Sequence, residues 1–352
     1  MVAEKRMSIQ DSKPVCSVCI ANYNGERVLR DCIESVLAQE GDVPLEIIIH
    51  DDASTDDSCT WIKTQYPLDR FPQITLLESK ENVGFCVSNN RMVDRASGEY
   101  VLLLNNDAAL APDAISTLLA AANAQTRRGI LTLPQYDWET GSLVDRGCLL
   151  DPFYNPVPNL DPERNDVAMV IGACLWIPRA LWCELGGFPE WFESIAEDMK
   201  ICCQARLWGY PVQVASTSHY RHRQGASFGG NRVTGSGLAT TYRRRRLSER
   251  NKTYVMILCS PRFRLILTLP IHLTLLALEG ILISLLKRDM KPWHVIYFPT
   301  FVNLWRDASF VLRERREVQE KRLNSGLGYG RMFTCLPHKL RMLVQYGLPK
   351  IR

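Results

Sequence analysis

Polar side chains follow three separate apolar runs in the first third of the chain. The clusters are Asn22-Tyr23-Asn24, Asp51-Asp52 and Asn106-Asp107. Asn and Asp are common turn residues, so a structural turn explains one such cluster easily and three much less well. Carboxylates repel phosphate groups unless a divalent cation lies between them. Mg²⁺ or Mn²⁺, held by one or two carboxylates together with substrate phosphates, satisfies these charges. The clusters therefore predict a nucleotide–metal site.

The order of the elements determines whether these clusters can meet. The strand-like runs are 15–20, 45–52, 73–79 and 99–104, and the helix-like segments are 28–39 and 83–97. This alternation predicts an α/β fold with a mostly parallel sheet and helices on both faces. Ligands bind such sheets beyond the carboxyl ends of the strands. We therefore expect the three clusters to share one rim of the sheet.

The sequence argues against three familiar kinds of ligand site. The first strand is not followed by G-x-G-x-x-G, and G-x-x-x-x-G-K-[ST] does not occur, which argues against a classical dinucleotide site and a P-loop. Cys16 and Cys19 have C-x-x-C spacing, but no second pair at zinc-ligand spacing follows. The twelve cysteines are predicted to be small buried hydrophobes in a reducing compartment.

A second group of reactive side chains lies about 90 residues further on, at Glu197-Asp198, His219 and His222. One carboxylate of the pair can act as a general base on a hydroxyl group. Acidic residues also favour helix N-termini for electrostatic reasons, so a structural role stays open. The H-x-x-H spacing of the histidines is compatible with metal binding or with a solvated basic loop.

Five ordered motifs resemble those of the family-2 inverting glycosyltransferases with the GT-A fold, closest to the bacterial rhamnosyltransferase-like branch. The motifs are VCSVCIANYNG, EIIIHDDASTDDS, ENVGFCVSNN, GEYVLLLNNDAAL and GGFPEWFESIAEDMKICCQARLWGY. The resemblance covers roughly residues 14–250. It implies a Rossmann-like GT-A domain, a nucleotide-diphosphate sugar as donor and a divalent cation, Mg²⁺ or Mn²⁺, as cofactor.

Residue roles follow from the resemblance, position by position. On the donor side, Asp52 is expected to bind the base, Asn106 to lie near the ribose and Asp107 to bind the cation. The other residues expected to line the donor pocket are Asn22, Asn24, Asn82 and Asn90.

On the acceptor side, Asp198 is expected to be the catalytic base beside Glu197. His219 or His222 is expected to contact the metal or the diphosphate. The sequence departs from the family pattern at Pro189 and Lys200, where acidic residues are usual. Residues 224–241, rich in Gly, Ser and Thr, suggest a lid.

The C-terminal third combines charge with an apolar segment. The basic run YRRRRLSERNK precedes residues 265–286, which are long enough to cross a bilayer. Pro270, His272 and Glu279 interrupt that segment, and a central acid costs about 3 kcal/mol on insertion. A helix on the membrane surface, or a re-entrant hairpin with the segment WHVIYFPTFVNLW, explains both features, while a buried helix of the main domain stays open. No nucleic-acid module accompanies the arginines, so nucleic acid is not expected as a partner.

Composition and length complete the sequence-based interpretation. With 46% hydrophobic and 23% charged residues the chain is an ordinary folded protein, and 352 residues suit one large domain with an appendage. We predict a polar N-terminal tail (1–13) without a secretory signal, a GT-A domain (14–255) and a helical membrane-associated region (256–352).

The predicted function is inverting, metal-assisted sugar transfer to a hydroxyl of a glycan or lipid-linked acceptor at the cytoplasmic membrane face. A nucleotidyltransferase and a non-catalytic sugar-nucleotide-binding scaffold are the alternatives.

Overall fold

The computed structural model describes residues 13–223, 232–234, 237–324, 326–347 and 350–351. A seven-stranded sheet lies at the centre, in the order β12-β6-β11-β4-β1-β2-β3. Its strands are β1 (Cys16–Asn22), β2 (Leu45–Asp51), β3 (Ile74–Glu78), β4 (Tyr100–Asn105), β6 (Ile130–Thr132), β11 (Cys174–Pro178) and β12 (Val212–Val214). β1 pairs in parallel with β2 and β4, and β2 with β3, whereas β11 is antiparallel to β4 and β6. The mostly parallel α/β sheet predicted from the sequence is confirmed.

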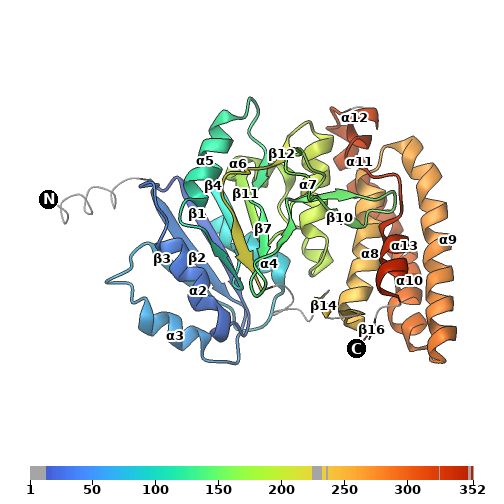
Figure 1. Ribbon diagram of the computed structural model, residues 1–352, viewed down its shortest axis with the longest axis horizontal. Helices are drawn as coiled ribbons and strands as arrows, with labels where there is room; N and C mark the ends of the chain where they lie inside the picture. Colours follow the sequence, from blue (N-terminus) through green and yellow to red (C-terminus); the bar gives the residue numbers. More distant parts are fainter. Residues whose placement is uncertain (1–12, 224–231, 235–236, 325, 348–349, 352) are drawn as a thin grey trace.

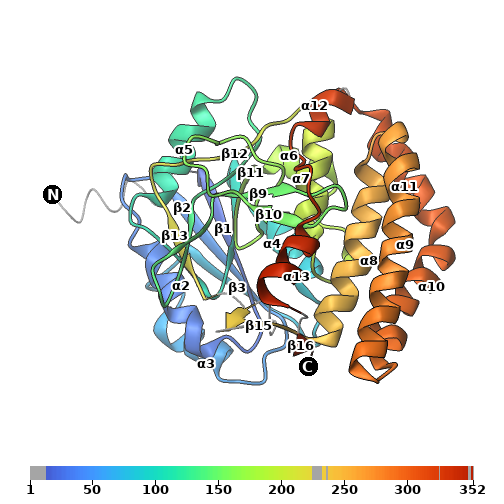
Figure 2. The same cartoon turned by 45° about the vertical axis from the view of Figure 1, so that its right-hand side comes forward.

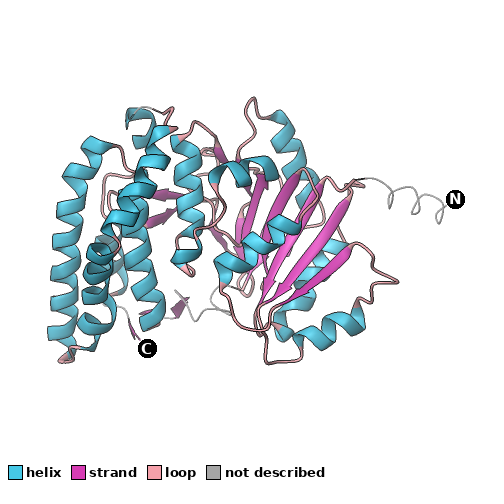
Figure 3. Ribbon diagram, turned by 180° about the vertical axis from the view of Figure 1, so that it is seen from behind, coloured by secondary structure: helices cyan, strands magenta, loops and turns pink. Residues whose placement is uncertain are grey.

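Helices cover both faces of the sheet because successive strand residues point to opposite sides. The helices around the sheet are α2 (Glu26–Leu37), α3 (Ser58–Gln65), α4 (Phe85–Arg95), α5 (Ala114–Ala124), α6 (Arg179–Leu185) and α7 (Glu197–Leu207). On β4, Leu102 and Leu104 pack in the cluster that contains α2 and α5, while Val101 and Leu103 pack in the cluster that contains α4 and α7. Figure 3 shows the sheet between its helices.

A second, smaller sheet lies next to the carboxyl ends of the central strands. It has the order β5-β13-β7-β8, formed by β5 (Ala108–Leu110), β7 (Gln135–Asp137), β8 (Leu143–Asp145) and β13 (Tyr220–His222). β5 begins directly after Asp107 and pairs with β13, so His222 lies opposite Ala108. This pairing, which the sequence did not suggest, brings together segments more than 100 residues apart.

The C-terminal helices stack beside α7 as further layers (Figures 1 and 2). They are α8 (Tyr242–Cys259), α9 (Arg262–Lys287), a π-helix (Trp293–Tyr297), α10 (Phe298–Arg306), α11 (Ala308–Glu320), α12 (Gly326–Gly330) and α13 (His338–Tyr346). The minor strands are β9 (Cys148–Leu150), β10 (Pro156–Pro158), β14 (Arg232–Thr234), β15 (Gly237–Thr240) and β16 (Lys350–Ile351). Side chains of α8 and α11 belong to the same buried cluster as α7, so these layers share one core with the sheet. α8 also crosses the predicted boundary at residue 255.

The cysteines behave mostly as predicted. All twelve lie in the described part of the chain, all are unbridged, and nine are buried. Cys183 and Cys335 are the exposed exceptions.

Candidate functional site

Hydrogen bonds join the three polar clusters at the rim, by which we mean Asn22, Asp51, Asp52, Asn106 and Asp107. The Asn22 side-chain amide donates to the Asp51 carboxylate at 2.8 Å, and the Asn106 side-chain amide donates to the Asn22 side-chain oxygen Oδ1 at 2.8 Å. All five side chains are buried. The expectation that the clusters share one edge of the sheet is therefore confirmed.

Gly25 is required by this arrangement. A Cβ atom at that position would lie 2.1 Å from the Asn22 side-chain oxygen and 2.3 Å from the Asn106 side-chain nitrogen. Neither amide can move without breaking the hydrogen bond between them, so a side chain at position 25 and the Asn22–Asn106 contact are mutually exclusive.

The loops that follow β1 and β2 lie beside the rim and contact each other. Asn24 accepts a hydrogen bond from the Thr55 backbone N–H at 2.7 Å, which holds the two loops together. A pocket of about 450 Å³ opens beside them, lined by Asn24, Gly25, Glu26, Arg27, Val28, Thr55 and Asp56. Its volume lies within the usual range for small-molecule sites.

Asp52, expected to bind a base, holds a main-chain turn in this structure. Its two carboxylate oxygens accept the N–H groups of Val83 and Gly84 at 2.7 and 2.9 Å. The Asn82 amide donates to the Asp52 carbonyl oxygen at 3.3 Å. Each carboxylate oxygen keeps a second lone pair, so base binding by Asp52 stays a prediction.

Asn90 lies apart from these contacts. Its amide donates to the Phe188 carbonyl and accepts the Phe188 N–H, at 2.9 and 3.0 Å. These bonds tie α4 to the loop after α6. The structure thus gives Asn90 a loop-holding contact, and its predicted place in the donor pocket remains untested.

The two histidines of the H-x-x-H segment separate. His222 Nε2 lies 3.0 Å from Asp107 Oδ1, and both side chains are buried. His219 instead packs edge-on against Tyr136. Of the two candidates, only His222 contacts the predicted cation ligand.

Asp107 and His222 form an oxygen–nitrogen donor pair that suits a divalent cation such as Mn²⁺. Within the described residues no group of three or more His, Cys, Asp and Glu side chains could hold a metal by itself. Oxygen atoms of a bound diphosphate would have to complete the coordination, which is how Mg²⁺ commonly binds at nucleotide sites. The residues present fit a cation that arrives with its substrate.

Glu197 and Asp198, the acid pair, open helix α7. Asp198 Oδ2 accepts the Gly172 N–H at 3.0 Å, and Oδ1 accepts the Met199 N–H at 2.7 Å. Glu197 is 6% exposed, and its Oε2 has no hydrogen-bond partner among the described residues.

These surroundings shift the pKa values of the pair unequally. Burial, and then the charge of Asp198, raise the pKa of Glu197, while burial raises the pKa of Asp198 against the opposing effect of its two backbone N–H donors. The nearby Arg244 lowers the pKa of both carboxyls. Asp198 accepts two N–H groups at short distance, whereas Glu197 Oε2 accepts none among the described residues, so the negative charge of the pair is better stabilised on Asp198 and the proton on Glu197.

The acid pair and the rim are connected through residues 172–173. The Asn105 N–H donates to the Ala173 carbonyl at 3.1 Å, and Asn105 directly precedes Asn106. The neighbouring Gly172 N–H donates to Asp198. Two adjacent residues therefore connect the end of β4, which leads to the candidate cation site, with the start of α7, which carries the candidate base.

Two further charged side chains, Lys200 in α7 and Arg223 directly after β13, make contacts that fix their direction. The Lys200 side chain donates to the Leu185 carbonyl at 3.3 Å, so it points toward α6. Arg223 donates to Asp31 and lies over the ring of Trp138, 3.6 Å from its centroid. The predicted lid falls largely on 224–231 and 235–236, which lie outside the described residues.

Comparison with known proteins agrees with this arrangement. The family model "Glycosyl transferase family 2" matches residues 17–181, and "Glycosyl transferase family group 2" matches residues 100–305, more than half of the chain. The chain belongs to glycosyl transferase family 2. The family match includes the rim and, in the second case, the acid pair.

Relatives and a solved structure extend the comparison. N-acetylglucosaminyl-diphospho-decaprenol L-rhamnosyltransferase of Mycobacterium tuberculosis is 26% identical over 188 residues, 45% of this chain and 60% of that protein. Chondroitin synthase of Pasteurella multocida is 28% identical over 201 residues, 56% of this chain and 20% of that protein. The crystal structure of GalNAc-T7 with UDP, GalNAc and Mn²⁺ matches with a TM-score of 0.62 at 14% identity, covering 96% of this chain and 59% of that one.

Two conclusions follow from these matches. The family-2 glycosyltransferase has the GT-A fold, as the motifs predicted. The chain spans less than two thirds of the length of the first relatives it matches.

Proposed function

We propose that this family-2 glycosyltransferase moves a sugar from a nucleotide-diphosphate sugar to a hydroxyl of a glycan or lipid-linked acceptor, with inversion and with help from a divalent cation. The observation that carries the proposal is the bridge at Gly172-Ala173, which joins Asp198 to the strand that ends at the rim. A base and a cation site with different tasks are what a single displacement from a nucleotide sugar requires.

Each side chain has a separate role in this reaction. Asp107 and His222 would hold the cation, which when bound would stabilise the negative charge that develops on the leaving diphosphate. Asp198 accepts the proton of the acceptor hydroxyl as the hydroxyl oxygen attacks the anomeric carbon. Glu197, protonated at neutral pH, leaves Asp198 as the one charged member of the pair. A single displacement leaves no covalent intermediate, so the product has inverted configuration.

The relatives support the classes of donor and acceptor. The GalNAc-T7 structure contains UDP and Mn²⁺, and the mycobacterial relative is named for transfer to a diphospho-decaprenol-linked sugar. A lipid-linked acceptor also agrees with an apolar surface on α9. This helix is long and apolar enough to cross a membrane, with a mean hydropathy of 2.0 over its most apolar window.

The side chains of α9 divide into two faces. His272 and Ser284 are buried, and Glu279 is ion-paired with α8 and α13. The exposed apolar side chains of α9 are Phe263, Ile266, Leu267, Ile271, Leu275, Leu278, Ile281, Leu282, Leu285 and Leu286. A helix with one face attached to the domain and the other apolar suits the plane of a bilayer surface better than its interior. We propose that α9 holds the enzyme on the cytoplasmic membrane face.

The test is a screen of nucleotide-sugar donors with Mn²⁺ or Mg²⁺, scored by release of nucleoside diphosphate and by the anomeric configuration of the product. We expect Asp198→Asn to lower transfer by about 10² to 10⁴ while donor affinity is kept. Glu197→Gln is the matched control and should cost less. Full transfer by Asp198→Asn, or a product of retained configuration, would refute the mechanism.

A further inference from the structure

The loop that leads into the acid pair has a backbone that its residue types disfavour. Glu193, Ile195 and Ala196 have φ angles of 65°, 71° and 70°. For a β-branched residue such as Ile195 a positive φ is a true outlier. Such conformations persist only where the surrounding structure enforces them. Something must therefore hold residues 192–196 in place.

The holding group is Asn251 in the middle of α8. Its side-chain nitrogen lies 2.9, 2.9 and 2.8 Å from the carbonyl oxygens of Phe192, Ser194 and Ile195. The Asn251 side chain is 0% exposed. One buried amide group thus contacts the backbone carbonyl oxygens of three of the four residues 192–195.

Arg250 reinforces the same loop from the preceding position. Its guanidinium group donates to the Phe192 carbonyl at 3.1 Å and pairs with the Glu193 carboxylate at 3.1 Å. These contacts are separate from the acid pair, since neither Arg250 nor Asn251 is bonded to Glu197 or Asp198 in the described contacts.

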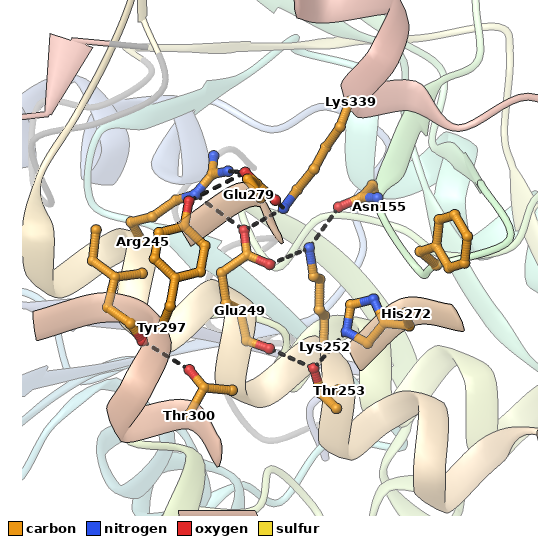
Figure 4. A network of polar contacts seen from close by, with 12 residues as sticks. Asn155, Arg245, Glu249, Lys252, Thr253, His272, Glu279, Tyr297, Thr300 and Lys339 are labelled. Atoms are coloured by element: carbon orange, nitrogen blue, oxygen red, sulfur yellow. Dashed lines mark hydrogen bonds and ion pairs between the residues drawn. The ribbon is translucent and has the colours of Figure 1, made fainter. Parts of the chain in front are cut away.

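α8 is itself fixed on its other side by a buried ion network (Figure 4). Glu249 pairs with Lys252 and with Lys339 of α13, each at 2.6 Å. Arg245 and Lys339 both pair with Glu279 of α9. A helix held by α9 and α13 in this way is a rigid support, which is what a positioning group needs in order to fix a geometry.

We propose that Asn251 is a positioning residue for the proposed transfer: it sets the loop 192–196 so that α7 begins at Glu197 with Asp198 aimed at the acceptor hydroxyl. The inference rests on the proposed function for its chemistry. A displacement of about 1 Å at a reacting group costs about 10² in rate. Loss of the Asn251 contacts should therefore act on the chemical step and not on donor binding, because the rim has its own hydrogen bonds.

Asn251→Ala tests this, with Asn159→Ala as a matched control. Asn159 is also a buried amide, and it donates to the carbonyl groups of Arg146 and Arg164 at 3.1 and 2.9 Å, with no hydrogen bond to the acid pair or to residues 192–196 in the described contacts. We expect Asn251→Ala to lower kcat by about 10² with nucleoside diphosphate affinity changed by less than about threefold. Asn159→Ala should lower the free energy of unfolding, but it should not lower kcat selectively while the affinity for nucleoside diphosphate stays the same.

Hydrogen exchange gives a readout that does not depend on chemistry. The amides of 192–197 should exchange faster in Asn251→Ala than in the wild type and should not change in Asn159→Ala. Unchanged exchange there, or an equal loss of kcat in both variants, overturns the positioning role. Faster exchange in a chain whose wild type transfers no sugar would support the loop contact and refute the proposed reaction.

Asn251→Asp is a second variant that keeps the size of the side chain. It leaves no cavity, so a change in its kcat cannot be attributed to misfolding caused by lost packing. One oxygen of the introduced carboxyl group would keep the hydrogen bond that Arg250 Nε donates to Asn251 Oδ1 at 2.9 Å, while the other would replace the NH₂ group and face the three carbonyl oxygens. In its ionised form that second oxygen is repelled by the carbonyls, and only the protonated form donates a hydrogen bond to them. The ratio of variant to wild-type kcat should therefore rise as pH falls. A ratio that is independent of pH overturns the proposal.

Discussion

Glu279→Leu separates two interpretations of α9 because they predict effects of opposite sign. If α9 crossed a bilayer, removing a central acid would favour insertion by about 3 kcal/mol. In the structure, however, Glu279 accepts hydrogen bonds from Arg245, from Lys339 at 2.7 Å and from the Tyr297 hydroxyl at 3.2 Å. Its removal should therefore destabilise the whole fold.

The size of this effect follows from the charges that remain. Without Glu279, Glu249 is the one acid of the network facing three cations, Arg245, Lys252 and Lys339. Removing one partner of a buried pair costs about 3 to 5 kcal/mol. The Glu279 side chain is 24% exposed, which lets water solvate part of the remaining charge. We therefore expect a loss of about 2 to 3 kcal/mol.

Urea unfolding of the purified chain, monitored by tryptophan fluorescence, measures this loss. Thr274→Leu is the matched control, since it adds an apolar side chain to the exposed face of the same helix without contacting the network. Adding Lys339→Met to Glu279→Leu should recover part of the stability, because it removes one of the unpaired cations. A Glu279→Leu chain that is as stable as the wild type, or more stable, would refute the assignment of α9 to the domain.

Four further outcomes are expected. Asp107→Ala should abolish the Mn²⁺ dependence of nucleoside diphosphate affinity in calorimetry; equal affinity of the wild type in chelator would rule out the cation role. Gly25→Ala should weaken the same affinity at least tenfold, because its Cβ displaces the amides that join the rim; wild-type binding would contradict the close contact. The raised pKa of Glu197 means that its contribution to stability is full at low pH and is lost as pH rises through the folded-state pKa, so the Tm of wild type should fall relative to Glu197→Gln from about pH 5 to about pH 8; parallel Tm curves would disprove the shift. Leu267→Glu with Leu275→Glu should abolish binding to anionic vesicles at unchanged Tm, because it removes exposed apolar surface and adds charge that the lipids repel; retained flotation would refute the membrane surface.

The central sheet was predictable because its information is local. Continuous apolar runs such as 100–104 are typical of strands buried on both faces of a parallel sheet, and turn residues after each run mark the carboxyl edge. The hydrogen bond between Asn22 and Asp51 follows directly from that topology. The sequence could not choose between His219 and His222, since that choice depends on the pairing of β13 with β5.

The positioning residues were missed because their signal is tertiary. In the sequence, Arg250 and Asn251 end a basic run and suggest a charged surface. In the structure, Arg243 and Arg250 both face Glu193, at 3.9 and 3.1 Å, and Arg245 faces Glu249 at 3.0 Å. One local signal was available in the sequence. The apolar stretch YVMILC, which is typical of a buried helix, immediately follows Asn-Lys-Thr on the same helix. Polar residues on such a helix should have been expected to find internal partners.

The role of α8 also determines how membrane binding can be tested. Deleting the chain from Pro261 onward removes α9 and α13, and with them Glu279 and Lys339. Glu249, which is 1% exposed, would then lose Lys339, one of its three cationic partners, and both Glu249 and the buried Lys252 would lose the cover of the deleted helices. The same helix carries Asn251, so a truncated chain would lose its support for the acid pair as well as its apolar surface. Loss of membrane binding and loss of activity would thus coincide for structural reasons, and only substitutions on the exposed face of α9 can separate them.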